Sequence, residues 1–110
     1  MLTLPLDPGG RMFIQINISH SDHPIDEFMA LEHEFAEATE GARTIRRGIG
    51  CVGSDDPTLR VLIAFFDSKE DAEANSKLPG TDQIASKVIG MIKEDMPEFL
   101  NLEVKSDRTF

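Results

Sequence analysis

The sequence predicts an α+β domain whose segments follow the order strand, helix, strand, strand, helix, strand, that is, βαββαβ. The first observation behind this prediction is the spacing of apolar residues, which alternates in the predicted strands and has a helical period in the predicted helices. The second is that residues 61–66, VLIAFF, are apolar on both faces of a strand. Such a strand requires cover on both sides. Two helices cover only one side, so the other is expected to meet a second copy of the chain, with an enclosed space between two sheets.

The first strand is predicted over residues 12–19, and its two faces differ in chemistry. One face carries Ile14, Ile16 and Ile18, and we assign it to the core beneath the helices. The other face mixes apolar and polar residues, and we assign it to the space between the sheets, where it would line a ligand cavity. The predicted ligand-binding residues are Phe13, Gln15, Asn17 and Phe66.

The first helix is predicted over residues 24–39. Pro24 is tolerated in a first helical turn, and Ser21 or Asp22 can cap it. Gly41 supplies the stop. The apolar residues recur at helical spacing and form a core stripe of Ile25, Phe28, Leu31, Phe35 and Ala38.

The second helical region opens at Ser68, whose hydroxyl can cap the first turn. Pro79 and Gly80 interrupt this region, which is expected to resume over residues 81–95. Pro97 then ends it.

The remaining strands are predicted over residues 44–52, 61–66 and 99–105. The first two are separated by residues 54–57, SDDP, which favour a turn. Two consecutive strands joined by such a turn form a hairpin. The three strands and the first strand then share one antiparallel sheet with both helices on one face.

Length and composition limit the organisation of the chain. With 110 residues, of which 40% are hydrophobic, it is expected to form a single domain over residues 12–105. Residues 1–11, rich in proline and glycine, are expected to form a flexible arm, and residues 106–110 a tail. The net charge of −9 repels phosphate backbones and anionic lipids, so neither nucleic acid nor membrane is an expected partner.

The cysteine content and the first ten residues indicate the expected cellular location of the chain. Cys51 is the single cysteine, so no disulfide forms within the chain. The segment MLTLPLDPGG lacks the basic start and long apolar run of a signal peptide. A cytoplasmic location is therefore expected.

The stretch from Gly50 to Ala72, GCVGSDDPTLRVLIAFFDSKEDA, resembles the strand, turn, strand and SKE-helix signature of antibiotic-biosynthesis-monooxygenase-like proteins. The resemblance implies a ferredoxin-like fold whose sheets pair face to face into a dimeric α+β barrel. Proteins of this kind include cofactor-independent oxygenases of polycyclic phenols or quinols, haem-degrading enzymes, and proteins without demonstrated activity. The resemblance thus implies a homodimer that binds a small hydrophobic or aromatic ligand, with no cofactor expected.

Three positions bear on activity within this resemblance. Phe66 stands where many oxygenase-like members have Trp, which removes a hydrogen-bonding group but keeps a ring. Asn75 stands where quinol-monooxygenase-like members often have His, and an amide cannot take up a proton near neutral pH. Asn17 matches a functional Asn of haem-degrading relatives, but no His follows at the position that would ligate iron.

Other patterns favour structural interpretations. Residues 48–53, GIGCVG, match a dinucleotide fingerprint, but a hairpin follows where that motif requires a helix. His20, Asp22 and His23 offer metal-ligating atoms without a remote third ligand, so helix capping is favoured and no metal site is predicted. Cys51 is expected to be a buried small hydrophobe.

Two functions remain open. In the first, the chain is a cofactor-independent monooxygenase-like enzyme acting on a small aromatic or quinol-type substrate in an inter-sheet cavity. By alternation, either Arg46 or Arg47 faces that cavity as an anion stabiliser, while His20 or His23 is the candidate base at its mouth. In the second, the same cavity binds a small hydrophobic molecule without turnover, or the dimer is structural. The sequence names no catalytic residue.

Overall fold

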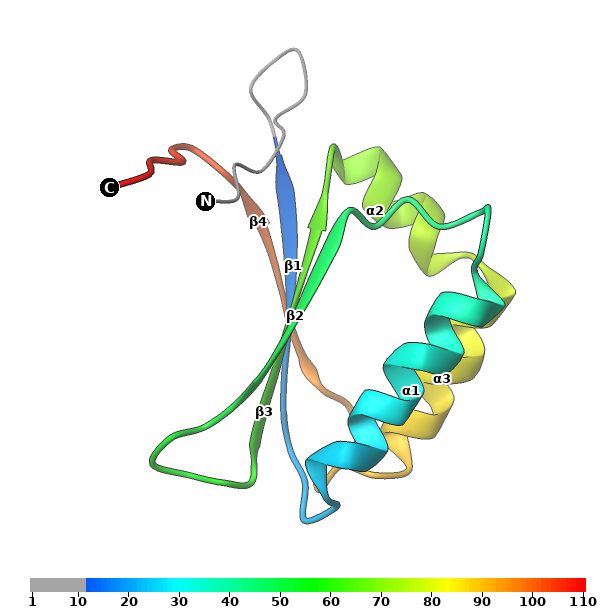
Figure 1. The fold of residues 1–110 in the computed structure, drawn as a ribbon, viewed down its shortest axis with the longest axis vertical. Helices are drawn as coiled ribbons and strands as arrows, with labels where there is room; N and C mark the ends of the chain where they lie inside the picture. The colour runs from blue at the N-terminus through cyan, green and yellow to red at the C-terminus, as the bar shows by residue number, and fades with distance from the viewer. Residues whose placement is uncertain (1–11) are drawn as a thin grey trace.

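The structure, a computed structural model, describes residues 12–110, so the arm predicted at residues 1–11 lies outside the described residues. The elements are β1 (Phe13–His20), α1 (Ile25–Ala38), β2 (Arg47–Val52), β3 (Leu59–Phe66), α2 (Lys69–Ser76), α3 (Pro79–Ile89) and β4 (Glu98–Glu103). The strands form one antiparallel sheet in the order β2-β3-β1-β4. The helices lie on one side of this sheet (Figure 1). This is the predicted ferredoxin-like βαββαβ arrangement.

The helix boundaries follow local sequence signals except at the start of α1 and the end of α3. The predicted cap of α1 by Ser21 or Asp22 is wrong, because Pro24 stands at the N-cap position and no side chain in the described range caps the helix. Ser21 Oγ instead accepts a hydrogen bond from the backbone N–H of His23 at 3.0 Å.

Gly41, just beyond α1, has a φ of 79°, a conformation that favours glycine. Ser68 Oγ accepts a hydrogen bond from the backbone N–H of Asp71 at 3.1 Å, so it caps α2 as predicted. The second departure is α3, which begins at Pro79 and ends at Ile89, short of the predicted residue 95, because the chain turns there.

That turn fixes the chain in front of β4. The backbone N–H of Lys93 donates to the carbonyl of His20 at 2.7 Å, and Ser21 Oγ donates to the carbonyl of Met91 at 2.6 Å. Ser21 is 1% exposed, so these bonds are made inside the domain. They replace the last helical turns and attach the segment before β4 to the end of β1.

The β2–β3 hairpin explains the glycines of the GIGCVG stretch. A side chain at Gly53 would collide with the carbonyl oxygen of Asp56, so the turn requires glycine there. At Gly50, a Cβ atom would lie 3.0 Å from Glu32 Oε1 on α1. A hairpin follows the glycines, as predicted, and no helix opens on them.

The mixed face of β1 is covered by the helices, which reverses the predicted assignment. Phe13 of β1 and Phe66 of β3 pair across the sheet, and both pack with Ala72 of α2 in the buried core. Because side chains alternate along a strand, the isoleucines of β1 point to the opposite face. The prediction that they lie beneath the helices is therefore wrong. Alternation separates two faces, but it does not say which one the helices cover.

The face without helices is called the open face below. The pair His20 and Leu59 stands at one end of this face. In the three rows that cross all four strands, the register places on it Ile14, Ile16, Ile18, Arg47, Ile49, Cys51, Val61, Ile63, Phe65, Glu98, Leu100 and Leu102. All but Arg47, Cys51 and Glu98 are large apolar residues. Leu100 and Leu102 are 40% and 42% exposed.

The helical layer contacts the sheet mainly through α2, which lies against β1 and β3, whereas α1 packs on α3. Helices α1 and α3 approach each other closely at Gly80. A Cβ atom added to Gly80 would lie only 2.8 Å from the Cβ atom of Ala38 on α1. Phe28, on the predicted stripe of α1, is only half-buried. On the helix-covered face, Leu62 and Phe99 are 37% and 47% exposed. The helices therefore leave part of this face accessible.

Candidate functional site

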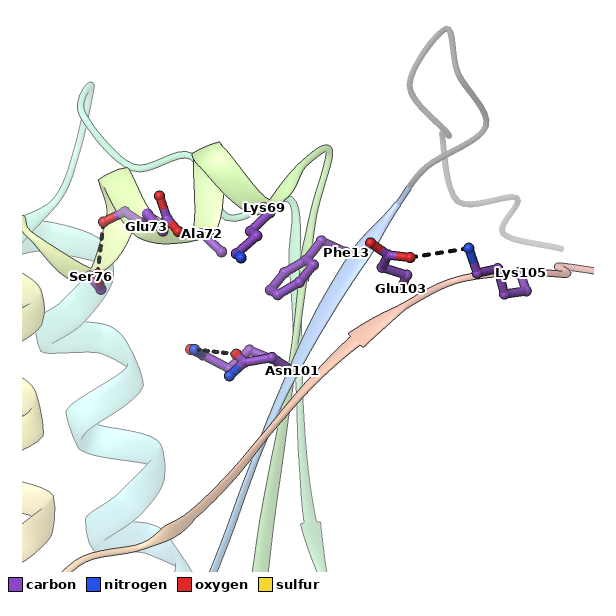
Figure 2. A pocket seen from close by; sticks show the side chains of 9 residues that line it. Phe13, Lys69, Ala72, Glu73, Ser76, Asn101, Glu103 and Lys105 are labelled. Carbon is purple, nitrogen blue, oxygen red and sulfur yellow. Dashed lines mark hydrogen bonds and ion pairs between the residues drawn. The ribbon is translucent and has the colours of Figure 1, made fainter.

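A pocket of about 690 Å³ opens on the helix-covered face between α2 and the strands β1 and β4 (Figure 2). The sheet contributes Phe13, Gln15, Asn101 and Glu103, followed by Lys105. Helix α2 contributes Lys69, Ala72, Glu73 and Ser76. Phe13 and Ala72 are buried members of the core, so an apolar floor meets a polar and charged rim. Such a pocket suits a small molecule with a flat apolar body and polar edges.

Two amide side chains lie side by side in this pocket. Gln15 and Asn101 are register partners on β1 and β4, and Gln15 Nε2 donates to Asn101 Oδ1 at 3.1 Å. An amide has both donor and acceptor atoms, so the bond leaves the Gln15 carbonyl and the Asn101 NH₂ group available to a ligand. The pair can therefore bind a hydroxyl group, a carbonyl group, or both.

The charged groups of the rim are arranged unequally. Lys105 Nζ lies 3.1 Å from Glu103 Oε2, so these two charges offset each other. Lys69 makes no ion pair with any residue in the described part of the chain, and Figure 2 shows its side chain extending from α2 toward Phe13. Glu73 follows Lys69 by four residues, which places both on one face of the helix. The α2 side of the pocket therefore offers a cation and a carboxylate.

The four residues predicted to bind ligand are on the helix-covered face, but they have different surroundings. Phe13 and Gln15 line the pocket. Phe66 is 2% exposed and belongs to the core beneath it. Asn17 follows Gln15 on the same face, and its Oδ1 atom is buried without a hydrogen-bond partner among the described residues. The predicted location of these residues between two sheets is wrong, because they face the helices.

Sequence reasoning missed Asn101 and the charged residues of α2. Asn101 lies between Leu100 and Leu102, so strand alternation alone marks it as the polar residue of an apolar segment. Its role became visible only with the register that pairs it with Gln15. Lys69 and Glu73 look like ordinary solvated residues of a helix, and no sequence signal distinguishes them.

Asn75 has a structural position. It is 6% exposed, and its Oδ1 atom accepts a hydrogen bond from the backbone N–H of Thr44 at 3.2 Å. The backbone carbonyl oxygen of Asn75 also accepts a hydrogen bond from Thr81 Oγ1 at 2.7 Å. Asn75 thus connects α2 to the chain before β2 and to the start of α3, and it is not among the residues that line the pocket.

The two predicted anion stabilisers also lie elsewhere. Arg46 Nε donates to Asp67 Oδ2 at 2.8 Å, and this hydrogen bond raises the pKa of the guanidinium. Arg47 is on the open face, with its guanidinium carbon 5.9 Å from the centre of the Phe65 ring. Alternation correctly separated the two arginines, but neither lines the pocket.

The histidines predicted at the cavity mouth are at the other end of β1. His20 Nδ1 lies 2.6 Å from Glu94 Oε2, and His23 Nδ1 lies 2.7 Å from Glu27 Oε2. Their assignment as a base at the mouth is wrong, because the pocket lies at the Phe13 end of the strand.

Three further observations concern metals, the thiol and membranes. Within residues 12–110, no group of three or more His, Cys, Asp or Glu side chains is arranged to hold a metal ion. Cys51 is exposed on the open face, so its predicted burial is wrong for the single chain. None of the helices in the described range has the length and apolar content that a membrane crossing requires.

Solved structures with the same fold cover most of the chain. A candidate antibiotic biosynthesis monooxygenase from Chloroflexus aurantiacus is 16% identical, with a TM-score of 0.67 over 89% of this chain and 97% of that one. SnoaB from Streptomyces nogalater, a cofactor-independent oxygenase, is 13% identical, with a TM-score of 0.66 over 90% and 96%. A conserved protein from Methanosarcina mazei is 10% identical, with a TM-score of 0.71 over 84% and 91%.

No protein-family model and no curated protein matches the chain. The likeness is therefore one of structure, and at these identities it concerns the fold. Over most of its length, the chain has the fold of the antibiotic biosynthesis monooxygenase structures.

Proposed function

We propose that the chain is a cofactor-independent oxygenase acting on a small aromatic or quinol-type compound, held between α2 and the sheet. The observation that carries this proposal is the pocket, in which the Gln15–Asn101 amide pair and the Lys69 ammonium surround the apolar floor of Phe13 and Ala72. The fold shared with SnoaB, itself a cofactor-independent oxygenase, supports the same class of reaction.

The residues that line the pocket suit such a substrate in polarity. The ring of a phenol or quinol would lie on the apolar floor, where burial of apolar surface favours binding. Its oxygen atom would meet the amide pair, whose free donor and acceptor atoms suit either a hydroxyl or a carbonyl. An apolar molecule without oxygen would leave the Gln15 carbonyl and the Asn101 NH₂ group without a partner beneath the ligand, which costs binding free energy.

The chemistry requires removal of a proton and stabilisation of the anion that remains. Glu73 is the carboxylate positioned to accept a proton, and Lys69 is the cation positioned to stabilise a phenolate or enolate. The electron-rich anion then reduces dioxygen directly. In a balanced reaction, an activated ring CH₂ group becomes a carbonyl, one oxygen atom of O₂ enters the product, and the other leaves as water with the two hydrogens.

A second candidate function is binding without turnover. It is favoured by one observation: none of the described residues that line the pocket is a histidine, so no imidazole is present as a base near neutral pH. The two candidates share the pocket and differ only in oxygen consumption.

The deciding experiment combines ligand binding with oxygen uptake, using a panel of quinols and anthrone-like phenols. Binding raises the melting temperature by mass action, with or without turnover. Asn101→Leu should weaken binding of an oxygenated ring roughly tenfold, the effect of one lost hydrogen bond. Gln83→Leu is the matched amide control, because Gln83 lies on α3 outside this pocket.

The outcomes separate the candidates. Oxygen uptake that falls in Glu73→Gln while binding is kept supports the oxygenase. Binding without uptake across the panel supports the second candidate. Equal affinity of Asn101→Leu and Gln83→Leu for every compound would remove the pocket as the site.

The chain is also proposed to act as a homodimer joined through its open faces. The open face is almost wholly apolar, and Leu100 and Leu102 remain 40% and 42% exposed in the single chain. Contiguous apolar patches of this kind mark protein–protein contacts in soluble proteins. A monomeric mass by light scattering at micromolar concentration would refute the dimer.

A further inference from the structure

The charged residues of the open face are placed at opposite corners of its three rows. The first row runs across the strands as Arg47, Phe65, Ile14 and Leu102. The middle row is Ile49, Ile63, Ile16 and Leu100. The third row is Cys51, Val61, Ile18 and Glu98. Arg47 thus lies at one corner on β2, and Glu98 at the diagonally opposite corner on β4.

We infer that Arg47 of one copy forms an ion pair with Glu98 of a second copy, and that this pair, made twice, selects the orientation of the two sheets. The inference rests on the proposed homodimer and adds how its two copies are oriented. The middle row supplies apolar contact between the two sheets, but it does not fix their relative orientation, because any rotation of one apolar face on another buries similar area. The charges of Arg47 and Glu98 at the corners fix the relative orientation of the two copies.

Symmetry leaves few ways to pair the faces. Two identical faces that meet are related by a two-fold axis lying in the plane of the contact. A two-fold axis parallel to the strands places Arg47 of one copy over Leu102 of the other. A two-fold axis perpendicular to the strands places Arg47 of one copy over Cys51 of the other. An axis along the diagonal through Arg47 and Glu98 places each charge over its own copy, which is repulsive. Only the diagonal through Cys51 and Leu102 pairs Arg47 with Glu98.

This diagonal axis has a structural consequence. It turns the strands of one sheet nearly at right angles to those of the other, which is a known mode of sheet packing. In such packing, the strand twist brings two diagonal corners together and separates the other two. With a right-handed β1–α1–β2 crossover, the corners that approach are those of Cys51 and Leu102. The separated corners leave room for the long side chains of Arg47 and Glu98.

The side chain of Arg47 is available for this contact. Its guanidinium lies over the Phe65 ring on the open face, and it forms no ion pair within the described chain. Glu98 is exposed and likewise unpaired in the described residues. A second copy would offer each charge a partner at the edge of an apolar interface, where screening by solvent is weaker than on a free surface.

Charge reversal tests the inference with the full-length chain. Arg47→Glu and Glu98→Arg each place like charges together at both ends of the interface, so each should raise the dimer dissociation constant about tenfold or more. The double variant restores the opposite charges in exchanged positions, and its dissociation constant should return to near the wild-type value. Arg46→Glu is the matched control, because Arg46 pairs with Asp67 away from the open face.

Sedimentation equilibrium measures each constant, and circular dichroism reports folding. A wild-type monomer would refute the dimer itself. A wild-type dimer with unchanged constants in both single variants, or a double variant as weak as the singles, would overturn the orientation and leave the dimer intact.

Cross-linking provides a second measurement that needs no substitution in the interface. Only the proposed axis places Cys51 opposite its own copy, and Cys51 is the single cysteine of the chain. Copper-phenanthroline with dioxygen should therefore convert the wild-type dimer to a disulfide-linked dimer, since the oxidant takes two electrons and two protons from the thiols. A dimer that remains uncross-linked under these conditions would contradict the axis.

Discussion

The two faces of the sheet differ in how their polar and apolar side chains are distributed. The helix-covered face carries Phe13, Gln15 and Asn101 in one area, so apolar contact and hydrogen bonding occur together there. The open face is apolar across its middle row, and in its three rows it carries charge only at Arg47 and Glu98. A face that binds a small polar molecule has to expose polar atoms within an apolar surround. A face that meets another sheet needs apolar area and a few charges to set orientation.

The largest expected effect comes from the core of the helix-covered face. Phe66 is 2% exposed and packs with Phe13 and Ala72, so Phe66→Ala should lower the free energy of unfolding by about 3–5 kcal/mol. Phe99 lies on the same face but is 47% exposed, so Phe99→Ala should cost less than about 1 kcal/mol. Urea unfolding measures both. Equal losses would show that α1 and α3 cover this face more closely than the structure indicates.

The next effect compares neighbours on β3 that point to opposite faces. Ile63 lies in the middle row of the open face, whereas Leu62 points toward the helices. Ile63→Lys would bury a charge between the proposed sheets, so the dimer dissociation constant should rise by about 100-fold or more. Leu62→Lys should leave that constant unchanged. Analytical ultracentrifugation distinguishes them, and the reverse pattern would mean that the faces have been interchanged.

These comparisons show what the sequence could predict about the fold. The order of strands and helices follows from local signals, such as the Ser68 cap and the break at Pro79. The face of β1 beneath the helices was predicted wrongly, since a period of two is the same whichever face is covered. Choosing between the faces required the contact of Ala72 with Phe13 and Phe66, which joins residues far apart in the chain.

The candidate site was predictable only in part for a related reason. Phe13 and Gln15 lie on one strand, so the alternation pattern brought them together, and both line the pocket. Asn101 reaches Gln15 through the β1–β4 register, which depends on how the last strand returns to the sheet. The predicted base at His20 or His23 ignored the length of β1, which separates those residues from Phe13 by most of the strand.

The smallest expected effect concerns the end of the sheet beyond the third row of the open face. Glu94 accepts hydrogen bonds from the His20 ring at 2.6 Å and from the His20 backbone N–H at 2.8 Å. These bonds lower the pKa of the Glu94 carboxyl below its ordinary value of 4.5. Asp56 also faces His20, with Oδ2 at 3.6 Å from Nε2, and hydrogen bonds from Thr58 lower the pKa of its carboxyl.

The sign of the pH dependence follows from the lowered pKa of Glu94. A carboxyl whose pKa is lower in the folded chain stabilises it fully above the unfolded pKa, and this contribution is lost as pH falls through the folded value. Glu94→Gln should therefore unfold more easily than wild type near neutral pH, and the difference should shrink as the solution becomes more acidic than about pH 4.5. Urea midpoints between about pH 3 and pH 7 measure it. The effect is small because the Glu94 side chain is 37% exposed and solvent screens its charge. A difference that stays constant to the lowest pH would mean that Glu94 acts only through uncharged contacts of the loop before β4.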